Sequence, residues 1–219
     1  MGATLCDGHP AYVESLRHLG EPVRLEACGG WLLRRSIPGS VLHDCAGPYP
    51  LFVRGAWARL PEDLATLAGL GVVSVTIVLD PFGGYSHASL ESVFDVVRVV
   101  KQRWIVDLRT GHERVVSPHH RRCAQEALAH IEVARCPEPR QHADEWCRCY
   151  RAFAEDRGIS GAAAFPERGL VDQLSIPGLL MYRASSGGQT VGFSLWMARP
   201  CVRRDCPAGG IRRADARTG

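Results

Sequence analysis

The sequence lacks the features that would assign it to several large classes of protein. It has no run of about 20 apolar residues, which argues against a membrane-spanning helix. Residues 1–12 show no basic start followed by an apolar core, so we expect no secretory signal and a cytoplasmic protein. The formal net charge of +3 is too small to indicate a membrane or nucleic-acid surface by itself.

Signature motifs of the common enzyme classes are also missing. There is no G-x-S-x-G elbow, P-loop, dinucleotide-binding glycine fingerprint or H-E-x-x-H helix. These absences remove the common hydrolase, kinase, dehydrogenase and zinc-protease interpretations, while other enzyme classes stay open.

Nine cysteines are scattered along the chain without the spacing of a disulfide framework. We expect reduced thiols that act as small apolar residues. Cys147 and Cys149 are two apart on an expected helix and point to different sides, which makes them poor joint ligands. His119, His120 and Cys123 carry ligand chemistry but lack the paired C-x-x-C or H-x-x-x-H spacing usual for zinc, so we expect no metal site.

The composition is that of a folded domain with a sizeable core: 46% of the 219 residues are hydrophobic and 22% are charged. Segments with strand patterns alternate with segments of helical periodicity. This alternation predicts an α/β (α+β) protein in which a mixed sheet is flanked by helices.

The first part of the chain gives a series of local predictions. Ser117 and Pro118 are a helix-start signal, and the helix should run to about residue 129. The other expected elements are a helix at 11–19, strands at 23–27 and 31–35, a helix from Pro61, a buried central strand at 72–79, a helix capped by Ser89, a strand at 104–108 and an extended segment at 131–134.

A linker is predicted at Cys136–Arg140, which contains two prolines. The expected organisation is an N-terminal helix and strands (1–40), a first unit (41–135), the start of a second unit (141–198) and a basic tail (199–219).

The segment 144–197 has the most regular pattern. Trp146, Cys149, Tyr150 and Phe153 fall at i, i+3, i+4 and i+7, which predicts an amphipathic helix. The following expected elements are a short strand at 162–165, a strand at 179–184, a hairpin turn at 185–188 and a strand at 190–196.

This order of elements resembles the front half of the GNAT acyltransferase fold, in its FemAB-like branch. Residues 73–84 resemble the central strand and turn of a first, degenerate unit. Residues 104–108 and 117–122 resemble the junction before the second unit, and 146–196 resemble its opening. The resemblance implies transfer of an acyl group from acyl-CoA, or from a charged tRNA in peptidoglycan-building members, to a small-molecule amine.

The phosphate-binding loop that the resemblance implies, Gln/Arg-x-x-Gly-x-Gly/Ala, is not recognisable. Residues 158–163 share its glycine and alanine spacing but precede the wrong elements. Residues 199–219 hold six arginines and almost no aliphatic side chains. We expect a disordered end from a truncated or frameshifted reading frame, and thus a transferase without its donor site. A nucleic-acid contact is the weaker alternative because the tail has no aromatic residues for base stacking.

Five side chains are candidates for an acceptor pocket, and no residue is assigned as the catalytic base. Ser194 and Trp196 should share one face of their strand, although the size of Trp196 favours a core position. The candidates are Phe165, Gln173, Tyr182, Ser194 and Trp196.

The cations His119, His120, Arg121 and Arg122 lie at an expected helix start, where each exposed charge costs about 0.3–1 kcal/mol against the macrodipole. We expect internal pairing, with Asp107 and Glu113 as partners. Contact with an anionic substrate is the alternative.

A non-catalytic interpretation also stays open. A degenerate unit could serve as a binding or dimerisation module whose exposed strand edge pairs with a second copy.

Overall fold

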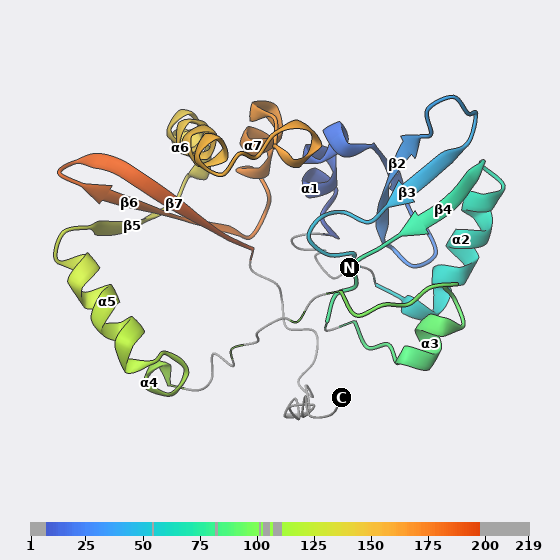
Figure 1. The fold of residues 1–219 in the computed structure, drawn as a ribbon, viewed down its shortest axis with the longest axis horizontal. Helices are drawn as coiled ribbons and strands as arrows, with labels where there is room; N and C mark the ends of the chain where they lie inside the picture. Colours follow the sequence, from blue (N-terminus) through green and yellow to red (C-terminus); the bar gives the residue numbers. More distant parts are fainter. Residues whose placement is uncertain are drawn as a thin grey trace, which may run out of the picture.

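The computed structural model describes residues 8–53, 55–81, 83–100, 102, 106 and 111–197. It has an α+β fold with two sheets, one mixed and one antiparallel, which confirms the predicted fold class. Figure 1 shows the two sheets on opposite sides of the molecule, with α1 and α7 between them.

The first sheet contains four strands whose order in space follows the sequence. They are β1 (Glu21–Arg24), β2 (Trp31–Ser36), β3 (His43–Ala46) and β4 (Val72–Thr76). The first two pairings are antiparallel and β3–β4 is parallel. A parallel pair needs a crossover, and the 3₁₀ turn Trp57–Arg59 and α2 (Leu60–Ala68) provide it. Pro61 lies in the first turn of α2, as its fixed φ favours.

β4 differs from the buried central strand expected at 72–79. It ends at Thr76 and lies at the edge of the sheet, where Val72 is buried but Val73 is 57% exposed. An isolated bridge between Phe52 and Leu79 continues the parallel pairing. β-Branched residues favour a strand but do not determine how many neighbours it has.

The core of this half lies between the sheet and α2. Cys28 and Cys45 are buried in it as small apolar side chains, as expected. The buried members are Leu25, Cys28, Leu32, Cys45, Phe52, Leu60, Leu67 and Val72.

The helix expected to be capped by Ser89 is short and starts earlier. α3 (His87–Glu91) has Ser86 at its N-cap, and Ser89 is the third helical residue of a reciprocal capping box. The hydroxyl of Ser86 accepts from the Ser89 N–H, and the hydroxyl of Ser89 accepts from the Ser86 N–H. The expected strand at 104–108 lies outside the described residues, apart from Val106, which is in no regular element.

Helices α4 (His112–Val115) and α5 (Pro118–Leu128) precede the second sheet. The predicted start of α5 is confirmed, since the hydroxyl of Ser117 accepts from the N–H of His120. The second sheet is antiparallel in the order β5 (Glu132–Cys136), β6 (Leu179–Ser186) and β7 (Gln189–Met197). Its predicted hairpin is confirmed: Gly187 and Gly188 form the turn with φ of +55° and +78°.

Helices α6 (Ala143–Asp156) and α7 (Glu167–Gln173) lie on one face of this sheet (Figure 1). A short 3₁₀ turn, Pro139–His142, leads directly into α6. The predicted amphipathic helix is confirmed, although Phe153 is 51% exposed. The expected strand at 162–165 is replaced by the 3₁₀ turn Gly161–Ala163, because alanines have little preference for a strand.

The sheets differ from the expected division of the chain. β2 and β3 pair across residue 40, and β5 and β6 pair across the expected linker. β1 and β2, which lie within the first forty residues, therefore belong to the first sheet. The segment before β1 connects the two halves, because α1 (Pro10–Ser15), which a 3₁₀ turn (Arg17–Leu19) follows, packs on α7. The cluster between the halves buries Tyr12, Val13, Leu16, Leu33 and Ile176.

Candidate functional site

The accessible face of the second sheet brings together three of the five acceptor-pocket candidates. Tyr182 of β6 lies directly opposite Ser194 of β7, and Leu180 lies opposite Trp196. Residues opposite each other in an antiparallel pair point to the same face. This face therefore presents two hydroxyl groups beside a large aromatic ring.

Trp196 is not a core residue, in contrast to the expectation based on its size, because its side chain is 62% exposed. The prediction that Ser194 and Trp196 share a face is confirmed, and Phe193 and Leu195 point the other way into the core beside Met181. Successive side chains of β7 point to opposite faces of the sheet, and α6 covers the face of Phe193 and Leu195. Trp196 points to the opposite face and is therefore exposed.

Phe165 and Gln173 lie on the other side of the sheet. The Phe165 ring packs edge-on against Tyr150 and His18. The backbone N–H of Phe165 donates to the Tyr150 hydroxyl at 2.9 Å. Gln173 of α7 is 9% exposed, and its Nε2 has no hydrogen-bond partner within the described part of the chain. The five candidates therefore do not line one common pocket.

A polar cluster around Glu145 was missed by the sequence analysis. Glu145 Oε2 accepts from Thr190 Oγ1 at 3.0 Å and lies 3.7 Å from His142 Nδ1 and 3.8 Å from an Arg183 nitrogen. These residues come from α6, both strands of the hairpin and the turn before α6. Their separation in sequence forms no motif, so local patterns could not reveal the cluster.

Cys136 adjoins this cluster at the end of β5. Burial raises the pKa of its thiol, and the positive charge of Arg183 opposes this effect while the Glu145 carboxylate adds to it. A protonated, 5% exposed thiol is a poor nucleophile, so the cluster anchors the hairpin to α6 rather than activating Cys136.

Two of the four cations at the start of α5, Arg121 and Arg122, have partners within the chain, although not the carboxylates that were expected. An Arg121 nitrogen donates to the carbonyl oxygens of Glu113 at 2.9 Å and Val116 at 2.6 Å. Arg122 lies 3.7 Å from the carboxylate of Glu126. Glu113 accepts from Arg121 through its backbone carbonyl oxygen, and Asp107 lies outside the described residues.

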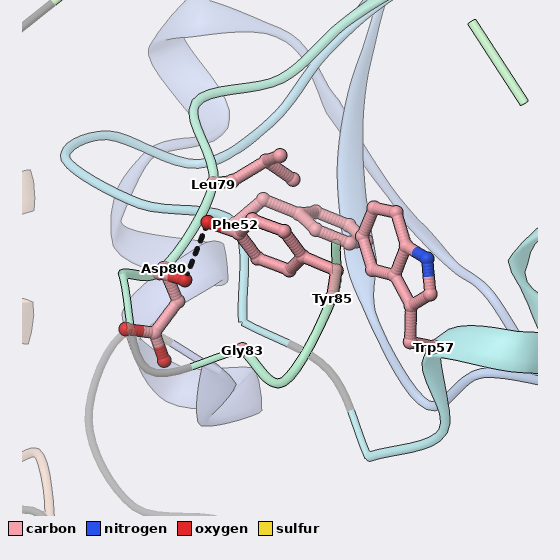
Figure 2. A pocket seen from close by; sticks show the side chains of 6 residues that line it. All are labelled: Phe52, Trp57, Leu79, Asp80, Gly83 and Tyr85. Atoms are coloured by element: carbon pink, nitrogen blue, oxygen red, sulfur yellow. Dashed lines mark hydrogen bonds between the residues drawn. The ribbon is translucent and has the colours of Figure 1, made fainter. Parts of the chain in front are cut away.

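Below the first sheet, the turn after β4 encloses a small cavity of about 20 Å³ (Figure 2). The Tyr85 hydroxyl donates to the Asp80 carbonyl oxygen at 2.9 Å, and its ring packs against Trp57 with centroids 5.3 Å apart. This volume holds about one water molecule, so the cavity fits no organic substrate.

A larger surface hollow of about 330 Å³ lies between β1 and α2. Leu25 and Leu67 line it, and the charges on its rim are paired, with Arg59 donating to Glu62 at 3.0 and 3.1 Å. Because each cation already has a carboxylate partner, the rim offers no evident subsite for an anion.

Asp63, which also lines this hollow, anchors the β1–β2 connection. Its two oxygens accept from the N–H groups of Ala27 at 3.0 Å and Cys28 at 2.7 Å. Burial alone would raise the pKa of Asp63, but these donors outweigh it and hold the pKa below its usual value. The ionised carboxylate therefore has a structural role, because it accepts the two N–H groups that fix the β1–β2 connection.

Comparisons with known proteins do not assign the site. A scan against protein-family models gives no match, and a search of curated proteins finds no significant relative. No helix in the described part of the chain is long and apolar enough to cross a bilayer. Within the same residues, no group of three or more His, Cys, Asp or Glu side chains could hold a metal ion.

Proposed function

We propose that this chain is related to the acyl-CoA-dependent N-acyltransferases, with the open face of its second sheet on the acceptor side. One observation carries the proposal: α6, α7 and the hairpin β6–β7 occur in the order of helices and hairpin that the GNAT resemblance implies. The shared face of Tyr182, Ser194 and Trp196 supports it further, because these three candidates were selected from the sequence alone.

The chemistry requires few protein side chains. An acceptor amine attacks the thioester carbonyl carbon, a C–N bond forms, the C–S bond breaks, and CoA leaves as its thiol while the amine loses a proton. Tyr182 and Ser194 supply hydroxyl groups that could orient a polar acceptor, and Trp196 supplies an apolar surface. We assign no side chain as the base. The donor-binding elements implied by the resemblance would follow Met197, outside the described residues.

Calorimetry and product analysis test the proposal. The full chain is titrated with acetyl-CoA and with longer acyl-CoAs, and free CoA is then separated by chromatography after incubation with a panel of primary amines. Saturable donor binding with amine-dependent release of CoA would support an active transferase. Absence of binding by every acyl-CoA would contradict an enzymatic function for this chain and would support the non-catalytic module.

Variants then separate acceptor from donor effects. Trp196→Ala should raise the KM for the amine while leaving donor affinity unchanged. Val73→Ala is the matched control, since Val73 is an exposed apolar residue on the other sheet. Equal effects of both substitutions on the KM for the amine would contradict the proposal that the acceptor binds at the open face of the second sheet.

A second candidate function, a dimerisation module, is favoured by the edge of β7. This nine-residue strand, Gln189–Met197, contains no charged residue and no proline, which are the usual protections of an edge. No described strand pairs with its outer edge. A second copy could add its own β7 in antiparallel orientation about a two-fold axis.

Sedimentation measurements distinguish this second candidate. Val191→Lys places a charge at an exposed position of β7 and should abolish a concentration-dependent dimer, whereas Val73→Lys on β4 should not. A dimer that survives Val191→Lys, or a chain that is monomeric throughout, would rule out pairing through β7.

A further inference from the structure

The open face of the second sheet carries an arginine beside the two hydroxyl groups. Arg135 of β5 lies directly opposite Tyr182 of β6, and Tyr182 lies opposite Ser194 of β7. Residues opposite each other on neighbouring strands point to the same side of a sheet, so these three polar side chains form one row across the open face. Arg135 was not among the candidates drawn from the sequence, because only strand pairing brings it beside them.

The positive charge of Arg135 is not neutralised within the described part of the chain. Arg135 is exposed, and its guanidinium has no hydrogen-bond or ion-pair partner among the described residues. The other paired positions on this face hold no acidic residue, and they are Val133, Leu180, Ala184, Gly192 and Trp196. Arg183, by contrast, points to the side of α6, where it lies 3.8 Å from the Glu145 carboxylate. The open face is therefore positively charged.

The two hydroxyl groups of the row are also available to a ligand. Neither the Tyr182 nor the Ser194 hydroxyl has a hydrogen-bond partner among the residues that the structure describes. Helices α6 and α7 lie on the opposite face of the sheet (Figure 1). A Cβ atom added at Gly192, next to Ser194 on the same face, would meet nothing within 4 Å. A guanidinium and two O–H groups directed into open space are donors suited to the oxygens of a carboxylate.

The position of Trp196 adds a requirement for an apolar group. Trp196 follows Ser194 by two residues on the same face and is 62% exposed. Two steps between strands and one two-residue step along β7 place the Cα atoms of Arg135 and Trp196 about 12 Å apart. Both side chains are long and can extend toward each other, which shortens this gap. A molecule that contacts both must therefore have an anionic end and a large apolar end.

We propose that the acceptor bound by this face is an amino acid with a large apolar or aromatic side chain. Its carboxylate binds Arg135 and accepts from Tyr182 and Ser194, while its side chain lies on Trp196. This inference rests on the proposed acyl transfer and narrows the acceptor from amines in general to amino carboxylates. The phosphate groups of acyl-CoA are the other anions that Arg135 could bind, so the experiment must separate the acceptor from the donor.

Three probes test the carboxylate directly: L-phenylalanine, L-phenylalaninamide, which lacks the negative charge, and acetyl-CoA. Saturation-transfer NMR titrations of the full chain give the affinity for the first two without donor, and calorimetry gives the affinity for the third. We expect phenylalanine to bind about 10-fold more tightly than its amide at low ionic strength, since hydrogen bonds to charged groups are the stronger ones. Added salt should reduce this preference because exposed charges are screened.

Variants assign the preference to individual side chains. Arg135→Gln should abolish the preference for phenylalanine over its amide, whereas Trp196→Ala should weaken both ligands equally. Arg183→Gln is the matched control, because it removes a cation of the same sheet from the other face, and it should retain the preference. Circular dichroism establishes that each variant remains folded.

The possible outcomes separate this inference from the proposed transfer. Binding of phenylalanine that depends on Arg135 in a chain that binds no acyl-CoA would support the amino-acid site while excluding the transfer reaction. Equal binding of phenylalanine and its amide by the wild type, or a preference that survives Arg135→Gln, would overturn the inference. Loss of acetyl-CoA affinity in Arg135→Gln with an unchanged preference for phenylalanine would assign Arg135 to the donor phosphates and would overturn it as well.

Discussion

Gly169 of α7 lies directly against the backbone of Ser15 in α1. A Cβ atom added at Gly169 would come within 2.8 Å of the Ser15 carbonyl oxygen, closer than side-chain atoms normally approach a carbonyl. This close contact allows the two helices to bury Val13, Leu16 and Ile176 between the two sheets. The packing of α1 against α7 therefore depends on the absence of a side chain at Gly169.

Gly169→Ala should consequently destabilise the protein. Alanine is the better helix former by about 1 kcal/mol, but overpacking at a close backbone contact typically costs about 1–3 kcal/mol, so we expect a net loss. Urea unfolding measures the difference. Gly192→Ala is the control, because a Cβ at Gly192 meets nothing within 4 Å. Equal stability of the two variants would mean that α1 and α7 separate without penalty.

Asp63→Asn should weaken the connection between β1 and β2. The amide keeps one acceptor oxygen but directs its NH₂ group at a backbone N–H that now lacks an acceptor, at a cost of about 1–3 kcal/mol. Glu62→Gln on the same turn is the matched control. Its exposed ion pair with Arg59 should contribute no more than about 1 kcal/mol. Similar losses in both variants would indicate a general charge effect rather than the buried anchor.

The depressed pKa of Asp63 also predicts a pH dependence. In the folded state the carboxyl loses its proton more readily than in the unfolded chain, so the folded state is favoured wherever the group is ionised. This stability is present above the unfolded pKa of about 3.9 and is lost as pH falls through the lower folded pKa. The difference in unfolding free energy between wild type and Asp63→Asn should therefore shrink between pH 5 and acid, as measured by urea unfolding at several pH values. A difference in unfolding free energy that does not change with pH would show that ionisation of Asp63 does not contribute to stability.

Local signals in the sequence predicted several elements correctly. The hairpin between β6 and β7 follows from Gly187 and Gly188, which tolerate positive φ, and the start of α5 follows from the Ser117 hydroxyl. Each feature depends on residues within a few positions of one another. The amphipathic pattern of α6 similarly identifies the helix, but the two buried side chains of this helix, Cys147 and Ala154, lie outside the predicted four-residue pattern.

Features that depend on distant partners could not be predicted in this way. Alternation placed Ser194 and Trp196 on one face, but only the position of α6 determines that this face is open. β4 reads as a buried strand, yet its edge position depends on the order of strands in the sheet. The contacts of Glu145 join α6 to both strands of the hairpin, and no local pattern encodes them.

Cysteine reactivity should follow burial. Burial raises the pKa of the Cys45, Cys136 and Cys147 thiols, which keeps them protonated, whereas Cys123 is exposed on α5. A short treatment with N-ethylmaleimide followed by peptide mass spectrometry should label Cys123 before these three buried thiols, which should react only in denaturant. Labelling of Cys45 as fast as Cys123 would reveal local opening of the first sheet.

The Glu145 contacts predict an energetic coupling between α6 and the hairpin. Thr190→Val keeps the shape of the side chain and favours a strand, but it removes the 3.0 Å hydrogen bond to the carboxylate. Because Glu145 is 35% exposed, water can partly replace this donor, so we expect a loss near the lower end of about 0.5–1.5 kcal/mol. Thr190→Ser, which retains the hydroxyl, should lose less. A double-mutant cycle with Glu145→Gln isolates the interaction from the effect of strand propensity, and it should give a coupling energy of about 0.5 kcal/mol or more. Additive effects of the two substitutions would show that Thr190 and Glu145 act independently, leaving the hairpin held to α6 by its apolar contacts alone.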